Sequence, residues 1–314
     1  MAVAAVDPHG RDAERPGEIP KRGWWEIAKR VKEQIKRDRL SIIAAGVAFY
    51  GLLAVFPGLV ALYGLFADPV QVESHAQSLS AILPPQAAEV LMTQLREIAS
   101  TDQAALGIGA IGGLLLALWS ASSAVRTLME ALNVAYNEEE RRGMIAFYGT
   151  ALLLTFGAVV AIIVAMALVV VMPAVFKLIG LSGLVETLVS LVRWPVLALL
   201  AIVGFALVYR YAPSRAKPRW RWVSWGAGVA VAIWLVGSAL FSLYVTRFGN
   251  YNETYGAAGA IVILLMWFLL SSYAILIGAE INAEMERQTN KDTTAGRERP
   301  MGARGAYAAD TVGK

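Results

Sequence analysis

The chain has 314 residues, of which 57% are apolar and 17% are charged, and its net charge is +4. About a quarter of the residues of a soluble domain are charged, so this balance argues against a soluble globular protein. The sequence contains no cysteine, which excludes disulfides, thiolate metal sites and cysteine nucleophiles.

The two ends of the chain are more polar than the rest. Residues 1–23 and 288–314 contain proline or glycine and have little apolar sequence with which to pack. Segments of this composition cannot bury enough apolar surface to offset the loss of conformational entropy. We therefore predict a disordered cytoplasmic arm at the N-terminus and a disordered cytoplasmic tail at the C-terminus.

Residues 24–39 lead into the first apolar run and have a helical pattern. Their apolar residues repeat on one helical face: Trp24, Ala28, Val31 and Ile35. Lysines lie largely elsewhere on the same helix, which is typical of a helix at the membrane interface. We predict an interfacial amphipathic helix, either as a simple anchor or as an element that senses lipid.

Six apolar runs follow, each long enough for a helix that crosses the roughly 30 Å hydrocarbon core of a bilayer. They are Leu40 to Phe66, Leu106 to Leu132, Ile145 to Val171, Val185 to Tyr211, Trp222 to Phe248, and Gly256 to Ile281. We predict an all-α, polytopic membrane protein with six transmembrane helices, whose membrane domain covers residues 40–287.

Charged residues alternate between the connections of these runs. Basic residues cluster before the first run, between the second and third, between the fourth and fifth, and after the sixth. The connection 68–105 instead has one arginine against five acidic residues. Because cytoplasmic connections are enriched in lysine and arginine, both termini are predicted to be cytoplasmic.

The long outer connection holds two amphipathic segments. Within residues 69–105, Pro84 and Pro85 separate them, and a proline pair both ends one helix and suits the first turn of the next. We predict an outer helical hairpin. It could serve as a cap that packs over the bundle or as a moving lid over a substrate path.

The predicted orientation brings the ends of three runs to a similar depth near the cytoplasmic face. The polar residues at this depth are Arg126, Glu130, Asn133, Arg210, Glu280 and Asn282. Ionisable groups in or near hydrocarbon are costly unless they pair, so we expect at least one ion pair among them and treat them as a candidate polar cluster. The alternative is a structural clasp, or side chains that extend to the lipid head groups.

Two further places are candidates for solute contact. Pro57 interrupts the first run and could break its helix, as in transporters whose broken helices bind substrate, although kinks that only fit neighbouring helices are commoner. Asn250, Asn252 and Tyr255 lie in a polar outer turn that could bind a polar ligand. A turn that only fixes the angle between the fifth and sixth helices is at least equally consistent.

No constellation in the sequence is typical of a catalytic or metal site. The two histidines, His9 and His75, lie on opposite predicted sides of the membrane, and no cluster has metal-ligand spacing. We therefore expect no catalytic residues, no cofactor and no metal, and we do not expect an enzyme.

Six motifs in order resemble the YihY/BrkB family of bacterial inner-membrane proteins and cover the chain from about Arg37 to Arg287. They are AAGVAFY from Ala44, LWSASSAVRT from Leu118, ALNVAY from Ala131, YRYAP from Tyr209, NYNETYG from Asn250 and GAEINAE from Gly278. The resemblance implies a multi-pass inner-membrane protein related to a virulence factor associated with serum resistance. Members have also carried the label ribonuclease BN, against which the sequence argues because it lacks a metal-binding cluster.

The leading functional hypothesis is a transporter or flippase-like protein that moves an amphipathic or small polar solute and is linked to envelope integrity. The alternative is a non-transporting membrane scaffold or envelope-maintenance protein. The expected partners are the lipid bilayer and a lipid or small solute, with a second copy of the chain or an envelope protein also considered. Nucleic acid is not an expected partner.

Overall fold

The computed structural model describes residues 7–66, 93, 103–172, 184–248 and 257–313, and all regular elements among them are helical. The long helices are α1 (Lys21–Arg37), α2 (Leu40–Phe66), α5 (Gln103–Ala135), α6 (Met144–Met166), α8 (Leu184–Tyr211), α9 (Trp220–Phe248) and α11 (Ala257–Glu286). The short elements are η1 (Pro16–Glu18), the π-helical extension η2 of α6 (Ala167–Val171) and α12 (Tyr307–Asp310). The predicted all-α class is confirmed.

Several of these helices have the length and composition of membrane spans. Four qualify within the described residues: Met144–Val169, Leu191–Tyr211, Trp220–Arg247 and Ile261–Glu286. A fifth arises if α1 and the described part of α2 are taken as one span bent by 66°. The multi-pass membrane character is confirmed, and the predicted number of six spans is not established by the described residues.

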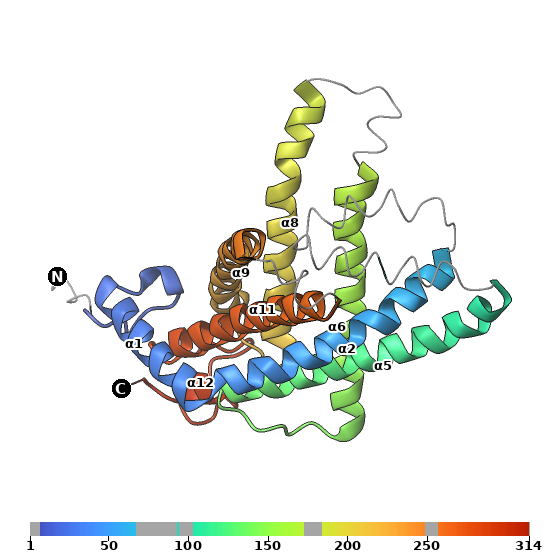
Figure 1. Ribbon diagram of the computed structural model, residues 1–314. Helices are drawn as coiled ribbons and strands as arrows, with labels where there is room; N and C mark the ends of the chain where they lie inside the picture. Colours follow the sequence, from blue (N-terminus) through green and yellow to red (C-terminus); the bar gives the residue numbers. More distant parts are fainter. Residues whose placement is uncertain (1–6, 67–92, 94–102, 173–183, 249–256, 314) are drawn as a thin grey trace.

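The helices meet at one end of the molecule, which we call the packed base. In Figure 1, α2, α5 and α11 run side by side and cross α6 and α8, which stand together. The largest buried cluster joins the first turns of α2, α6 and α9 to the last turns of α5, α8 and α11. Many of its members are alanines, among them Ala44, Ala135 and Ala227, and such small residues let helices approach closely.

Away from the base, large apolar side chains face outward. On α6 alone, Leu153 is 71% exposed, Phe156 66% and Ile162 59%. Soluble monomers rarely expose continuous apolar surface on this scale. Hydrocarbon is therefore the medium that suits these faces.

Both ends of the chain are packed in the structure, so the prediction that they are disordered is wrong for residues 7–23 and 288–313. The N-terminal segment supplies Ala13 and Ile19 to a buried cluster with α1. Within the tail, Thr293 is 0% exposed and Ala308 joins the main core. The composition argument failed because it counts apolar surface, whereas many contacts of these segments are hydrogen bonds to buried polar groups.

The predicted amphipathic helix is present as α1, and its buried face only partly coincides with the predicted stripe. Val31 of the stripe is buried and Trp24 and Ile35 are half-buried, whereas Ala28 is exposed, and the face also includes Ile27, Arg30 and Gln34. This face packs against the C-terminal part of α11, represented by Met285.

Two predicted features fall on parts of the chain that the structure does not describe. The outer hairpin lies outside the described residues apart from Thr93 and the start of α5, and so does the turn with Asn250, Asn252 and Tyr255. Pro57 lies within the bounds of α2, but its side-chain surroundings are not described. The roles suggested for these residues remain predictions.

Candidate functional site

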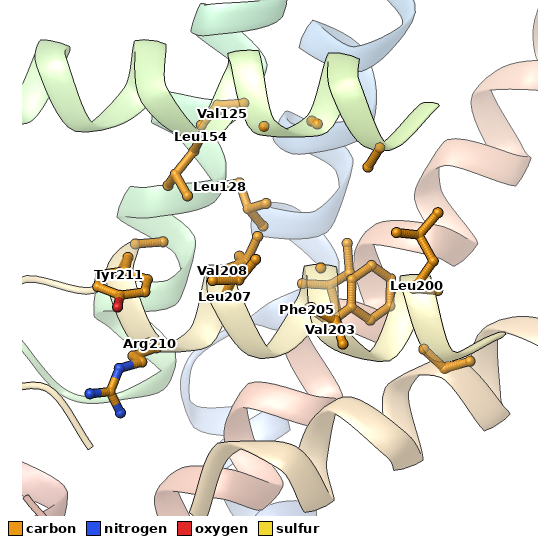
Figure 2. A pocket seen from close by; sticks show the side chains of 18 of the residues that line it. Val125, Leu128, Leu154, Leu200, Val203, Phe205, Leu207, Val208, Arg210 and Tyr211 are labelled. Atoms are coloured by element: carbon orange, nitrogen blue, oxygen red, sulfur yellow. The ribbon is translucent and has the colours of Figure 1, made fainter. Parts of the chain in front are cut away.

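A groove of about 1810 Å³ lies between α6 and α8 and also takes lining residues from α5, α9 and α11 (Figure 2). We call it the α6–α8 groove. Most of its lining is apolar, as Leu154, Phe205 and Val208 illustrate. Several lining side chains are exposed, including Leu153 and Phe156, so the surrounding medium has access to the groove.

One end of the α6–α8 groove, next to the packed base, is basic. Five basic residues line this cationic end: Arg141, Arg142, Arg210, Arg215 and Lys217. Figure 2 shows Arg210 and Tyr211 at this end and Leu200 toward the other. An apolar channel with cations at one end matches the shape of an amphipathic anion.

Aromatic rings hold two of these cations. The Arg210 guanidinium lies 4.6 Å from the ring centroid of Trp220, and the Lys217 ammonium lies 4.9 Å from that of Tyr211. Arg210 also donates from Nη1 to the carbonyl of Pro218, while its Nε has no partner among the described residues. The ring contacts position the charges without neutralising them.

Arg142 is fixed by a carboxylate in the loop between α5 and α6. Its Nε and Nη2 donate to the two carboxylate oxygens of Glu140 at 2.8 and 2.7 Å, and its Nη2 also donates to the carbonyl of Ala212 at 2.8 Å. The paired guanidinium lowers the pKa of Glu140 to about 2. Asn133 at the end of α5 joins this loop to the loop after α8. Its amide nitrogen donates to Glu140, and its side-chain oxygen accepts from the backbone N–H of Ser214.

Farther along the groove, polar groups on α9 and α11 bond to each other. Trp267 donates from its indole to Ser238 at 3.3 Å, and Trp234 donates to Ser271 at 3.0 Å. Ser238, Trp234 and Trp267 all line the groove. These bonds satisfy polar atoms that hydrocarbon could not.

The predicted cytoplasmic polar cluster does not assemble as one site. Arg126 donates to Ser122 and Ser123 on its own helix, with its guanidinium 4.9 Å from the Tyr148 ring centroid. Glu130 is exposed. The described residues contain no ion pair among the six members, because the arginines find partners in their own helix, loop carbonyls and aromatic rings.

Two members of that cluster are buried in the packed base. The side-chain oxygen of Asn282 accepts from the backbone N–H of Gly226 at 2.9 Å, which fixes the crossing of α9 and α11. Glu280 is 0% exposed, and neither of its carboxylate oxygens has a hydrogen-bond partner in the described part of the chain.

The charge pairs of the base involve residues that sequence reasoning missed. Arg30 donates from Nε to Glu284 at 2.5 Å and from Nη2 to Gln288 at 2.6 Å. Arg215 pairs with Glu286 at 2.6 Å, with both side chains 0% exposed. The position of Arg30 between Ile27 and Val31, on the buried face of α1, was the available signal for its burial.

No metal site emerges within the described ranges, where no group of three or more His, Cys, Asp or Glu side chains could hold an ion. His9, which was predicted to lie in a disordered arm, places Nδ1 2.7 Å from Glu26. His75 lies outside the described residues.

Comparisons with known proteins agree with this architecture. A family model described as Virulence factor BrkB matches residues 31–302. A Bacillus subtilis protein named YfkH and called ribonuclease-like is 32% identical over 78% of this chain and 90% of its own length. UPF0761 membrane proteins of Idiomarina loihiensis and Photobacterium profundum are each 29% identical, over 81% and 85% of this chain and 88% and 82% of their own lengths.

The comparison with solved structures found no match. The family match covers most of the chain and includes the whole of α2, α5, α6, α8, α9 and α11. The chain therefore belongs to the BrkB virulence factor family of multi-pass membrane proteins.

Proposed function

We propose that the protein is a transporter or flippase-like protein that moves an amphipathic solute with an anionic head group along the α6–α8 groove. The observation that carries the proposal is the pairing of apolar walls with a cationic end. Acyl chains would contact residues such as Leu154 and Phe205, and the head group would meet Arg210 and Lys217. Basic residues near a membrane surface each attract anionic lipid by about 1 kcal/mol.

The first test blocks the groove. Gly204 lines it, and a side chain there meets no atom within 4 Å at its first carbon. In proteoliposomes with fluorescent phospholipids, Gly204→Trp should slow transbilayer movement at least about tenfold. Gly149→Trp is the matched control, because Gly149 has equal space on α6 but does not line the groove. Equal rates for both variants and the unmodified chain would contradict the proposal.

The second test concerns head-group charge. Lys217 is exposed and lies in the lining, so Lys217→Gln should reduce the preference for anionic over zwitterionic lipid about fivefold, the factor that corresponds to about 1 kcal/mol. Lys291→Gln removes the same charge from an exposed tail position outside the groove and should leave the preference unchanged.

A second candidate function is a non-transporting envelope scaffold. The packing of both chain ends onto the base favours it, since Arg11 donates to the carbonyl of Gly313 at 2.7 Å and Gln288 to that of His9 at 2.7 Å. Such an arrangement presents a folded polar surface on one side of the membrane. Absence of lipid or solute flux in a folded, reconstituted protein would favour this function.

We further propose that the protein is not a ribonuclease, although one relative is called ribonuclease-like. In the base, Glu284 and Glu286 are each paired with arginine, which leaves them poorly suited to bind a catalytic metal. Purified protein should leave RNA intact in the presence of Mg²⁺ or Mn²⁺, and cleavage that copurifies with the folded chain would contradict this.

We also propose an inner-membrane location with both termini in the cytoplasm, which the alternation of basic connections supports. The chain lacks cysteine, so single substitutions give clean labelling. Asn290→Cys should react with an impermeant maleimide only after the inner membrane is opened, whereas Ser78→Cys should react from the periplasm. The reverse pattern would overturn the orientation.

A further inference from the structure

Two carboxyl groups meet where α1, α2 and α11 converge in the packed base. Glu280 on α11 is 0% exposed, and neither of its carboxylate oxygens meets a hydrogen-bond donor among the described residues. Asp38 lies in the joint between α1 and α2, and its Oδ2 is also buried without a partner. Leu40, which begins α2, and Ala279 on α11 belong to the same buried cluster, so Asp38 and Glu280 lie in one region, where their charges act on each other. Since an ionised carboxylate cannot donate, a hydrogen bond between them requires a proton.

The charges around this pair do not neutralise it. Arg287 acts on Glu280 and Arg37 acts on Asp38, while Glu284 adds negative charge beside both. Arg287 is itself bound to Glu284 at 2.5 Å, so it is not a dedicated partner of Glu280. Burial is the largest influence on Asp38 and raises the pKa of its carboxyl group.

A fully buried hydroxyl belongs to the same region. Tyr136 is 0% exposed, and its hydroxyl group interacts with the side chain of Asn282 and electrostatically with Glu280. Buried polar atoms of native proteins are nearly always satisfied, so carboxylate oxygens without a donor among the described residues indicate a ligand that supplies a hydrogen or a positive charge. A proton is the smallest such ligand.

Asp38 also occupies a hinge. The axes of Lys21–Arg37 and Leu40–Val55 differ by 66°, and Arg39, next to Asp38, has φ +49°. A non-glycine residue in this left-handed region costs about 1 kcal/mol or more and persists only where its surroundings hold it. The contact of Asp38 with Glu280 ties this joint to α11.

We propose that Asp38 and Glu280 bind one exchangeable proton between them and that this proton latches the α1–α2 joint to α11. Loss of the proton leaves two facing carboxylates in a low-dielectric site, and their repulsion moves the joint away from α11. If the groove transports a solute, as proposed above, this site couples that movement to a proton gradient. The proton site itself does not depend on transport.

Infrared difference spectroscopy of the full chain in detergent tests the site. At neutral pH the unmodified protein should show a protonated carboxyl band that shifts on exchange from H₂O into D₂O. Asp38→Asn and Glu280→Gln should each abolish it. Glu138→Gln is the control, because burial also raises the pKa of Glu138, whose carboxylate instead accepts from the backbone N–H of Tyr307. Absence of the band in the unmodified protein would overturn the proposal, even if neither variant folded.

Spin labels test the latch. Lys32→Cys on α1 and Ile261→Cys on α11 are exposed positions on two elements that the latch joins. Their separation should change as the pH is raised in the otherwise unmodified chain and stay fixed with Glu280→Gln, which mimics the protonated form. A separation that is independent of pH would overturn the latch. A melting temperature raised by NaCl in the unmodified protein but not in Glu280→Gln would instead assign the site to sodium and overturn the proton.

Discussion

At the scale of single residues, the buried pair of Arg215 and Glu286 is the most sensitive element of the base. Glu286 also accepts from Thr293 at 2.6 Å, and the Arg215 guanidinium lies 4.8 Å from the Tyr136 ring centroid. Removing one partner leaves an uncompensated buried charge, which costs about 3–5 kcal/mol. Arg215→Met should therefore lower the free energy of unfolding in detergent by about that amount.

The matching control replaces both partners. Arg215→Met combined with Glu286→Met removes both charges, and buried ion pairs replaced by apolar residues of similar volume often cost little. The double variant should recover most of the stability lost by the single one. A double variant as unstable as the sum of two single changes would show that the pair is not coupled.

Glu140 provides a dependence of stability on pH. Its pKa is held at about 2 in the folded chain, against an ordinary value of 4.5, chiefly by the hydrogen bond from Arg142. Because the folded pKa is lowered, this stabilisation is complete above pH 4.5 and is lost as the pH falls toward about 2.

Glu140→Gln should thus lower the melting temperature at pH 7 by about 2–4 °C, the shift given by about 1 kcal/mol after allowance for solvent screening. Its melting temperature should also fall less than that of the unmodified chain as the pH is lowered from 5 to 2. Glu139→Gln removes the same charge from the exposed neighbouring position and should show neither effect.

Residue pairing was the part of the site that sequence could not supply. Three of the residues that the sequence singled out, Asn133, Glu280 and Asn282, are buried in the packed base. The residues that they contact could not be predicted from the sequence. Ser214, Gly226 and Asp38 come from loops or other helices, and only tertiary packing brings them close.

At the scale of helices, the crossing of α9 and α11 depends on glycine. A Cβ on Gly226 would overlap the side-chain oxygen of Asn282 and the carbonyl of Gly278. Gly226→Ala should therefore destabilise the protein by about 1–3 kcal/mol through overpacking. Gly228→Ala, two residues along the same helix and with nothing within 4 Å of its Cβ, should be neutral or stabilising.

Unfolding of both glycine variants in detergent gives the measurement. The two substitutions change helix propensity equally, so the difference between them isolates the packing term. If the two variants unfold at the same denaturant concentration, the close crossing is not a determinant of stability.

Helices were the most predictable level of the structure. The apolar runs located α2, α6, α8, α9 and α11 to within a few residues, because composition and length alone identify a helix that suits hydrocarbon. The buried face of α1 was predicted only in part, because the sequence pattern did not include Ile27, Arg30 and Gln34. Its pattern was interpreted as if lipid were the neighbour, whereas α11 and the chain ends cover it with a mixture of apolar and hydrogen-bonding contacts.

For the whole molecule, the ends of the chain determine how the base is closed. Arg304, only 5% exposed, donates to the carbonyls of Ala309 and Asn290 at 2.7 Å each and to that of Lys291 at 3.1 Å. The tail in turn holds the loop between α8 and α9. Gly305 accepts from the backbone N–H of Ala216, and Thr293 from that of Arg219, both at 2.9 Å.

Loss of Arg304 should consequently loosen a loop that it does not touch. Arg304→Ala should increase the rate of limited trypsin cleavage after Arg219 about tenfold, which corresponds to about 1.4 kcal/mol of easier opening. Arg297→Ala removes a trypsin site from an exposed position of the same tail and should leave the rate unchanged. Equal rates in both variants would mean that the loop is held by α8 and α9 alone. Faster cleavage in Arg304→Ala would establish that the tail restrains Lys217, and with it the cationic end of the α6–α8 groove.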